Sequence, residues 1–400
     1  MNRQESSPFI LTINGGSSSI KFALFRAVDS SAPVTRGMVD RIGLPNSEMR
    51  ITDVATQQLS RRTVLAPDHR TCVGFITEWL EEQVGMGRLC AVGHRVVHGG
   101  KTYSGPERVT PELLAELRRL CPYSPEHLPA EITLIESFRQ YDSTLAQVAC
   151  FDTAFHRDMP LVARLLPIPR RYEKLGIQRY GFHGLSYAFL MRELARLGAP
   201  DEAEGRVILA HLGNGASMAA VKNGQALDTT MGFTPASGFP MSRRSGDLDP
   251  GLVSYFARTE GMTADRFHKM VNTESGLLGI SEISSDMRDL LKQEQNDSRA
   301  AEAIELFCYQ ARKWIGALAA ALGGLDTLVF SAGIGEHSPA IRARICAGLE
   351  FLGIDINEPA NETDQPVISS EESRVKVRVI PTDEEREIAE AVARLLGKGT

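Results

Sequence analysis

Two glycine- and serine-rich turns, one in each half of the 400-residue chain, restrict its fold more than any other feature. The first is Asn14-Gly15-Gly16-Ser17-Ser18-Ser19, and the second is Gly213-Asn214-Gly215-Ala216-Ser217; each lies between two short strand-like runs. Such turns let backbone N–H groups approach an anion closely. The repetition predicts a duplicated domain with a phosphate held between its halves, although each turn could also be an ordinary hairpin.

Strand-like runs alternate with helical stretches along the whole chain, which predicts an α/β protein. At about 150 residues per domain, the length corresponds to two or three domains. The best-marked helix is Pro111–Leu120, with Thr110 as its N-cap and a proline in its first turn. Strands are expected at Phe9–Ile13, Ile20–Phe25, Ala146–Phe151, Arg206–Leu212, Met218–Val221, Leu325–Ser331 and Val375–Ile380, and further helices at about Pro339–Leu349 and Glu384–Leu396.

The composition excludes several classes of protein. Apolar residues make up 42% of the chain, which is typical of a folded protein. The 44 basic and 50 acidic residues give a net charge of −6, which argues against a nucleic-acid or anionic-membrane binder. The apolar run Ile315–Leu322 is far shorter than the roughly 20 residues that span a bilayer. The first ten residues lack a signal-peptide pattern, and six separated cysteines indicate a reducing compartment, so we expect a cytoplasmic protein.

Some motifs that suggest other chemistries fail on inspection. Gly100-Lys101-Thr102 would belong to a phosphate-binding P-loop only if a glycine stood at position 95, which holds Arg95. The chain contains no H-E-x-x-H and no G-x-S-x-G, the usual signatures of zinc peptidases and serine hydrolases. His94 and His98 could chelate a metal on a helix, but the glycines and valines around them favour a strand with structural histidines.

Polar residues in the first half of the chain interrupt apolar runs. The segment Asn14–Lys21 could surround phosphoryl oxygens with hydroxyls, amides and one positive charge, or form a solvated hairpin tip. Arg95 lies between valines, and a buried guanidinium needs an anionic partner, either a structural carboxylate or a ligand. Asp152 ends a buried strand, which is where α/β folds place site residues.

The second half of the chain contains three further candidates. His183 lies between glycines, either as a packed loop histidine or as a catalyst. Arg244 lies in Arg243-Arg244-Ser245-Gly246-Asp247, a turn that could hold a guanidinium over an anion, as phosphoryl transfer requires. Glu384 and Glu385 begin a helix, where they could stabilise the helix dipole or bind Mg²⁺.

Together these segments resemble the acetate and propionate kinase family, within the actin, Hsp70 and sugar-kinase superfamily. Leu185-Ser186-Tyr187 stands where the family usually has Thr-Ser-His, and segments 121–129 and 236–243 also differ from its usual residues. The matching motifs follow in order through nearly the whole chain: NGGSSSIKF (14–22), GHRVVHGG (93–100), FDTAFH (151–156), YGFHG (180–184), AHLGNGAS (210–217), DTTMGFTP (228–235), RSGDLDPGL (244–252), ISSDMR (283–288), FSAGIGEHS (330–338) and IPTDEE (380–385).

The resemblance implies a duplicated actin-like ATPase (ribonuclease H-like) fold with an active-site cleft between two domains. Residues 1–151 with 386–400 would form the N-terminal domain, and residues 152–385 the C-terminal nucleotide-binding domain. The implied reaction is reversible, Mg²⁺- or Mn²⁺-dependent and direct in-line phosphoryl transfer from ATP to acetate, giving acetyl phosphate and ADP, in a homodimer. The alternatives are propionate or another short-chain carboxylate, another phosphoryl donor such as pyrophosphate, and a non-catalytic nucleotide-binding regulator.

The resemblance also implies a role for each matching residue. Arg95 would bind the carboxylate, while Asn14 and Glu384 would place the metal. The catalytic set would be Asp152, His183 and Arg244. Because a carboxylate substrate is already ionised at pH 7, Asp152 is expected to position a partner rather than to abstract a proton. The nucleotide and phosphate site would comprise Ser17, Ser19, Lys21, His211, Leu212, Gly213, Asn214, Gly215, Asp286, Met287, Arg288, Gly333, Ile334, Gly335, Glu336 and His337. Of these, residues 211–215 would bind the ATP phosphates, and residues 286–288 and 333–337 would hold the adenosine part.

Overall fold

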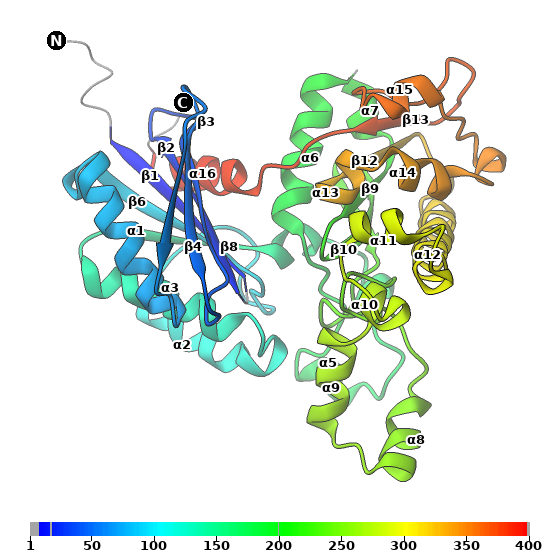
Figure 1. Ribbon diagram of the computed structural model, residues 1–400, viewed down its shortest axis with the longest axis horizontal. Coiled ribbons are helices and arrows are strands. Elements are labelled where there is room, and N and C mark those ends of the chain that lie inside the picture. The colour runs from blue at the N-terminus through cyan, green and yellow to red at the C-terminus, as the bar shows by residue number, and fades with distance from the viewer. Residues whose placement is uncertain (1–7, 17, 199, 398–400) are drawn as a thin grey trace. The chain divides into compact units, whose positions relative to one another are not determined.

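The computed structural model describes residues 8–16, 18–198 and 200–397, which form two compact units (Figure 1). The first unit comprises Met1–Ala154 with Asp383–Thr400, and the second comprises Phe155–Thr382. The two boundaries between the units lie a few residues from the domain boundaries that the sequence predicts. Asp152 and Glu384, which the sequence analysis assigns to the second domain, lie in the first unit because both contact Arg95 of its sheet.

The first unit is built on an eight-stranded sheet with the order β5-β4-β3-β2-β1-β6-β8-β7. Strands β1 to β5 form an antiparallel meander, and β6 and β8 then continue the sheet parallel to β1. The strands are β1 (Phe9–Gly15), β2 (Ser19–Arg26), β3 (Asp29–Asp40), β4 (Ser47–Asp53), β5 (Leu59–Val64), β6 (Leu89–Val96), β7 (Glu107–Arg108) and β8 (Ala146–Phe151).

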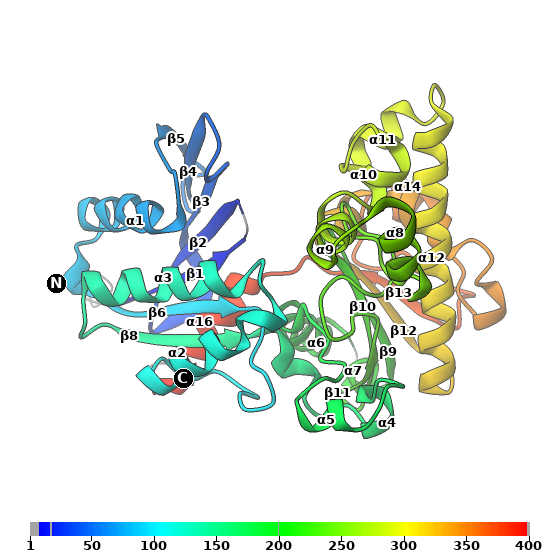
Figure 2. The ribbon, with the colours of Figure 1, turned by 90° about the horizontal axis from the view of Figure 1, so that it is seen from below.

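Helices cover both faces of this first sheet (Figure 2). One face carries α1 (His69–Gln83) and α3 (Leu128–Tyr141), and α2 (Pro111–Leu120) packs beside α3. The opposite face carries the C-terminal helix α16 (Glu384–Leu395). Helix α2 has the predicted bounds, and its predicted N-cap is confirmed because the Thr110 hydroxyl accepts a hydrogen bond from Leu113 N at 3.2 Å. Short 3₁₀ turns lie at Met86–Arg88 and Cys121–Tyr123.

The second unit repeats the topology of the first around a five-stranded sheet. Its order is β11-β10-β9-β12-β13, with β10 antiparallel to both neighbours and β12 parallel to both of its own. The strands β3-β2-β1-β6-β8 have the same order and directions, so the predicted duplication is confirmed. Each glycine-rich turn joins the first two strands of its repeat. The second set comprises β9 (Arg206–Leu212), β10 (Ala216–Lys222), β11 (Gln225–Thr229), β12 (Thr327–Ser331) and β13 (Lys376–Val379).

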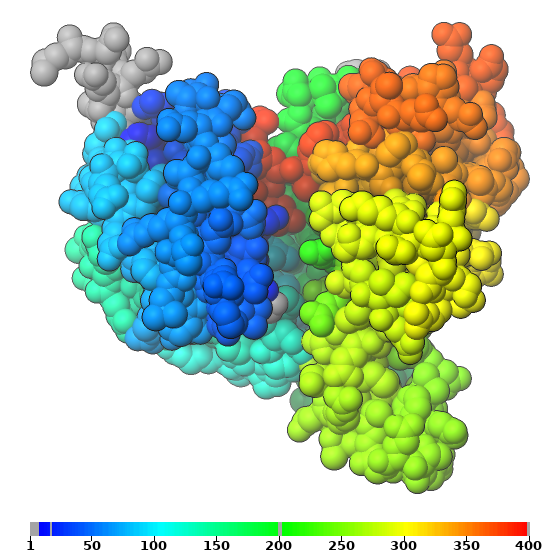
Figure 3. Space-filling model, in the orientation of Figure 1, coloured from blue at the N-terminus to red at the C-terminus, as the bar shows by residue number. Residues whose placement is uncertain are grey.

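Two long helices lie on opposite faces of the second sheet (Figure 2). Helix α6 (Gly184–Leu197) packs Leu190 and Leu194 among buried side chains of β9 and β10, and α12 (Ser298–Leu322) covers the other face. Helices α8 and α9 form the yellow-green outer end of this unit in Figures 1 and 3. The other helices are α4 (Leu161–Arg164), α5 (Arg171–Lys174), α7 (Pro200–Glu204), α8 (Gly251–Glu260), α9 (Ala264–Thr273), α10 (Gly276–Ser281), α11 (Met287–Gln293), α13 (Ala332–His337), α14 (Pro339–Cys346) and α15 (Glu358–Glu362), with 3₁₀ turns at Asp152–His156 and Glu350–Leu352.

Most predicted elements agree with the structure, and the differences lie at their ends. Strands β8 and β9 have the predicted bounds, whereas β12 begins two residues late and α14 ends at Cys346 instead of Leu349. His94 lies in β6 as predicted, and its Nε2 is 2.7 Å from Gln147 Oε1. No group of three or more His, Cys, Asp or Glu side chains arranged to hold a metal ion occurs among residues 8–16, 18–198 and 200–397. Over the same ranges, no helix is long and apolar enough to cross a bilayer.

The contact between β6 and α16 depends on the absence of a side chain at Gly93. A Cβ atom there would lie 2.4 Å from Ile388 Cγ2 and 2.7 Å from Val392 Cγ2. We expect Gly93→Ala to lower the free energy of unfolding by roughly 1–3 kcal/mol, because α16 must move away from the sheet. The measurement is urea unfolding, with Gly74→Ala as the matched control.

Gly74 lies within helix α1, and a Cβ atom there would meet nothing within 4 Å. Alanine favours helix more than glycine by about 1 kcal/mol, so Gly74→Ala should leave stability unchanged or raise it. Equal stability of the Gly93→Ala variant and the wild type would contradict the assigned packing of α16.

Candidate active site

A buried ion pair lies at the centre of the cluster in the first unit. Arg95, near the end of β6, donates from Nη2 to Asp152 Oδ2 at 2.6 Å and from Nε to both carboxylate oxygens at 3.1 and 3.2 Å. Asp152 is fully buried, and the Arg95 side chain is 17% exposed. Burial alone would lower the pKa of Arg95, but Asp152 and Glu384 outweigh it and raise that pKa. The guanidinium is therefore permanently charged, and a structural carboxylate is one partner of Arg95.

Two further segments join the same cluster. Asn14, at the end of β1, accepts a hydrogen bond from Arg95 Nη1 at 3.1 Å through Oδ1 and donates from Nδ2 to Glu384 Oε2 at 2.9 Å. Glu384 Oε2 also lies 3.8 Å from Arg95 Nε. The structure thus brings together four predicted residues from β1, β6, the end of β8 and the start of α16.

The phosphate-site residues predicted in the first hairpin lie on strand β2. Lys21 is directly opposite Asn14 in the β1–β2 register, so the two side chains share one face of the sheet. Lys21 is exposed, and Ser19 is half-buried. Ser17 lies outside the described residues.

The sequence analysis missed Glu131, which lies on the buried face of α3. Its Oε2 accepts a hydrogen bond from Val97 N at 3.0 Å, and its other oxygen is buried without a hydrogen-bond partner. Burial raises the pKa of Glu131 to about 8, although the Arg95 charge opposes this shift. The carboxyl group is therefore mainly protonated at neutral pH. The sequence pattern that could have identified Glu131 as a buried acid is its place on the apolar face of the helix, among Leu128, Ile132 and Ile135.

Stacked histidines form the core of the cluster in the second unit. The rings of His183 and His211 lie 4.2 Å apart at an angle of 18°. His183 Nδ1 is 2.8 Å from Ser217 Oγ, and His211 Nδ1 is 2.8 Å from Ser186 Oγ. His183 precedes α6 with a left-handed backbone (φ 58°), which turns its ring from the helix start towards the sheet. The sequence analysis assigned no role to either serine.

Arg244 and His183 both point at the glycine-rich turn. A Cβ atom built on Gly215 would lie 3.0 Å from His183 Nε2 and 3.4 Å from Arg244 Nη1. Arg244 is held by hydrogen bonds from Nη1 to Pro235 O at 3.1 Å and to Met241 Sδ at 3.6 Å. Glycine at 215 therefore lets the His183 ring and the Arg244 guanidinium approach the backbone of the turn closely. Two nitrogen-bearing side chains beside one glycine-rich turn suit a negatively charged group.

The turn 213–215 also lies beside the start of α13. A Cβ atom on Gly213 would be 3.5 Å from Ala332 Cβ, and one on Gly333 would meet nothing within 4 Å. Glu336, which was predicted to hold adenosine, accepts hydrogen bonds from Ala332 N at 2.7 Å and Thr382 N at 3.1 Å. The Glu336 side chain thus ties α13 to the segment after β13.

The other predicted adenosine residues begin α11. Asp286 is the N-cap of that helix and pairs with Arg288 Nη2 at 2.6 Å, and Met287 is buried. The predicted site residues therefore divide between the units. Asn14, Ser19, Lys21, Arg95, Asp152 and Glu384 belong to the first, and those from His183 to His337 belong to the second.

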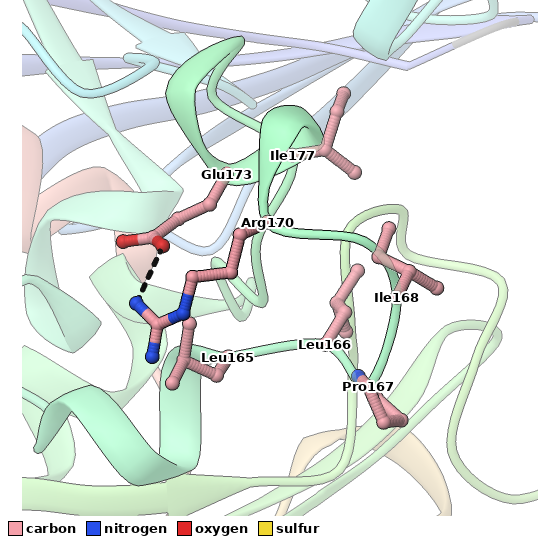
Figure 4. A pocket seen from close by; sticks show the side chains of 7 residues that line it. All are labelled: Leu165, Leu166, Pro167, Ile168, Arg170, Glu173 and Ile177. Carbon is pink, nitrogen blue, oxygen red and sulfur yellow. Dashed lines mark hydrogen bonds and ion pairs between the residues drawn. The ribbon is translucent and has the colours of Figure 1, made fainter.

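A hollow of about 250 Å³ in the second unit lies in a different segment from these clusters (Figure 4). It is lined by the loop 165–168 and by Arg170, Glu173 and Ile177, and Arg170 Nη1 forms an ion pair with Glu173 Oε2 at 3.3 Å. None of the predicted site residues lines this hollow.

The repeated sheet, with a glycine-rich turn after the first strand of each repeat, defines a duplicated actin-like ATPase (ribonuclease H-like) fold. The sequence matches the model of the Acetokinase family over residues 9–390, and the chain belongs to that family. It is 44% identical to acetate kinase of Methylocella silvestris, over 97% of this chain and 98% of that one. It is 43% identical to propionate kinase of Citrobacter rodentium, over 96% of both chains.

A solved structure agrees with this assignment. The crystal structure of Porphyromonas gingivalis acetate kinase superposes with a TM-score of 0.87 at 36% identity, covering 98% of this chain and 100% of that one. The family resemblance and the fold class predicted from the sequence are therefore confirmed.

The raised pKa of Glu131 predicts a pH dependence of stability. Between its ordinary pKa and about 8, the folded chain holds a proton that the unfolded chain has released. The free energy of unfolding should therefore fall as pH rises through this window. We expect Glu131→Gln to reduce this fall, measured by urea unfolding at several pH values from 5 to 9.

Glu136→Gln is the matched control, because Glu136 lies on the same helix and pairs with Arg118 at the surface. This control should keep the wild-type pH dependence. An unchanged slope in the Glu131→Gln variant would show that the buried carboxyl does not titrate as assigned.

Proposed function

We propose that the protein transfers a phosphoryl group reversibly and directly in line from ATP to acetate, giving ADP and acetyl phosphate. The observation that carries this proposal is the close approach of His183 Nε2 and Arg244 Nη1 to the glycine-rich turn at Gly215. An imidazole and a guanidinium fixed beside one turn suit the equatorial oxygens of a transferring phosphoryl group. Membership of the Acetokinase family supports the same reaction.

Arg95 is proposed to bind the acetate carboxylate. Its guanidinium is held by Asp152 on one side, and its remaining N–H groups can donate to a second carboxylate. Asp152 acts as a positioning residue, because its carboxylate is fully buried against Arg95. Acetate is ionised at neutral pH, so its oxygen can attack phosphorus without a general base.

The nucleotide is proposed to bind the second unit. The turn 213–215 would contact its phosphates, and the adjoining start of α13, with residues 286–288, would hold adenosine. Support comes from Gly333, where a side chain would meet open space, and from Gly213, where a Cβ atom would lie 3.5 Å from Ala332 Cβ.

Asn14 and Glu384 are proposed to hold Mg²⁺ or Mn²⁺ together with phosphate oxygens. One amide oxygen and one carboxylate fit the preference of Mg²⁺ for few protein ligands, all of them oxygen. When bound, the metal supplies positive charge that neutralises the phosphates. Asn14 and Glu384 also fix Arg95, so they orient the guanidinium as well.

Trapping of acyl phosphate as the hydroxamate tests the reaction with Mg·ATP and formate, acetate, propionate and butyrate. We expect acetate to give the highest kcat/KM. Propionate is the second candidate, because relatives with that printed activity are almost as similar as the acetate kinases. A preference for propionate would assign that substrate instead, and ATP binding without product from any acid would favour a regulatory protein.

Arg244→Ala should lower kcat/KM by more than a hundredfold, since a lost transition-state donor costs about 3 kcal/mol. Arg243→Ala is the matched control, because that exposed neighbour donates to Thr273 O at 3.0 Å. We expect the control to remain within a few-fold of wild type. A rate within tenfold of wild type for Arg244→Ala would contradict the role given to this residue.

We also propose that the protein is a homodimer in a reducing cytoplasm, without nucleic-acid or membrane partners. Exposed apolar side chains support a dimer, since Val162 is 82% exposed and Leu175 is 67% exposed in the second unit. All six cysteines are free, which supports the compartment. Sedimentation equilibrium should give twice the chain mass, and a monomer at all concentrations would contradict the dimer.

A further inference from the structure

We propose that Tyr187 acts through Ser217 as the positioning residue that keeps His183 in the tautomer with its proton on Nε2. The inference rests on the proposed phosphoryl transfer and adds a residue to the same site. Its basis is a hydrogen-bonded chain of three side chains, from α6 to β10 and back to the residue that precedes α6.

Ser217 lies between Tyr187 and His183 in this series of hydrogen bonds. Its Oγ is 2.5 Å from the Tyr187 hydroxyl and 2.8 Å from His183 Nδ1. Tyr187 and Ser217 are fully buried, and His183 is 9% exposed. His183 and Tyr187 are four residues apart, and Tyr187 N donates to His183 O at 3.0 Å, so one helical turn fixes their separation.

The geometry admits either atom as the donor in both contacts, and the proposal assigns one direction to the protons. In this direction the Tyr187 hydroxyl donates to Ser217 Oγ, and Ser217 donates its single proton to His183 Nδ1. Nδ1 then accepts, so the neutral ring carries its proton on Nε2.

The proton on Nε2 has a defined use. Nε2 is the His183 atom that approaches the glycine-rich turn at Gly215 most closely, and Arg244 Nη1 approaches the same residue. In this tautomer, His183 donates a hydrogen bond to a phosphoryl oxygen bound beside the turn. In the other tautomer, Nε2 would present a lone pair to a phosphoryl oxygen and repel it.

The neighbours of His183 give a reason to hold it neutral. Arg244 is a permanent cation that approaches the same turn as His183, and the stacked His211 ring lies 4.2 Å from the His183 ring. A proton added to His183 would meet both groups. The Tyr187–Ser217 chain lets the ring act as a donor without that charge.

The test uses Tyr187→Phe, Ser217→Ala and the double variant in the full-length protein. Nitrogen-15 NMR of histidine-labelled protein reports which ring nitrogen of His183 is protonated, with the His183→Asn spectrum assigning its signals among the nine histidines. Steady-state hydroxamate assays give kcat and KM for acetate and for Mg·ATP.

In the wild type we expect Nδ1 unprotonated and Nε2 protonated. Tyr187→Phe should introduce Nδ1-protonated forms and lower kcat at least about tenfold, with both KM values within about twofold. The double variant should be no slower than Ser217→Ala, because both changes break the same series of hydrogen bonds from Tyr187 through Ser217 to His183. Tyr180→Phe is the matched control: it removes another buried hydroxyl, which donates to Gly176 O at 2.8 Å, and should change neither readout.

Three results would overturn the proposal. One is an unchanged His183 spectrum and kcat in Tyr187→Phe, and another is a double variant whose losses multiply. The third is an equal spectral change in Tyr180→Phe, which would indicate general loosening. If Tyr187→Phe does not fold, Ser217→Ala decides by the same spectrum. Failure of the wild type to form any acyl phosphate would refute the proposed function alone, because the NMR result still tests the tautomer.

Discussion

The buried positive charge of Arg95 is the constraint on which the first unit depends. A guanidinium in an apolar strand is tolerated only if carboxylates and other acceptors surround it. Asp152 supplies the main pair, and Asn14 and Glu384 complete the set. These partners come from the ends of β1 and β8 and from the start of α16. One charge therefore fixes where the sheet ends meet the C-terminal helix, and it explains why Asp152 and Glu384 belong to the first unit.

The second unit has the same strand order but a different physical solution. Its cluster is held mainly by hydrogen bonds between hydroxyls and imidazoles, with Arg244 as its permanent cation. Gly215 takes part by having no side chain, so that His183 and Arg244 approach the same turn closely. Each repeat of the fold thus has a glycine-rich turn after its first strand. The side chains around that turn determine the chemistry of the repeat.

Local sequence was sufficient for the strand and helix pattern and for the duplication, because turn residues and apolar runs act over short distances. It also showed that Arg95 needs an anionic partner. It could not choose Asp152, because the pairing of β6 with β8 joins segments more than fifty residues apart. The same reason hid Ser217, which reaches His183 only through the packing of β10 against α6. Glu131 escaped notice because an acidic residue on a helix is ordinarily solvated, and only the fold buries it against Val97 N.

The partner of Ser217 links the stability of the second unit to its proposed chemistry. An apolar side chain at position 187 would leave the Ser217 hydroxyl with one partner fewer, at a cost of about 1 kcal/mol or more. The chain instead carries a tyrosine whose hydroxyl meets that serine at 2.5 Å. Because Ser217 also contacts His183 Nδ1, the hydrogen bonds that satisfy a buried serine are the same ones that orient the proposed catalytic ring. The packing of the second unit and the geometry of its site therefore depend on one set of side chains.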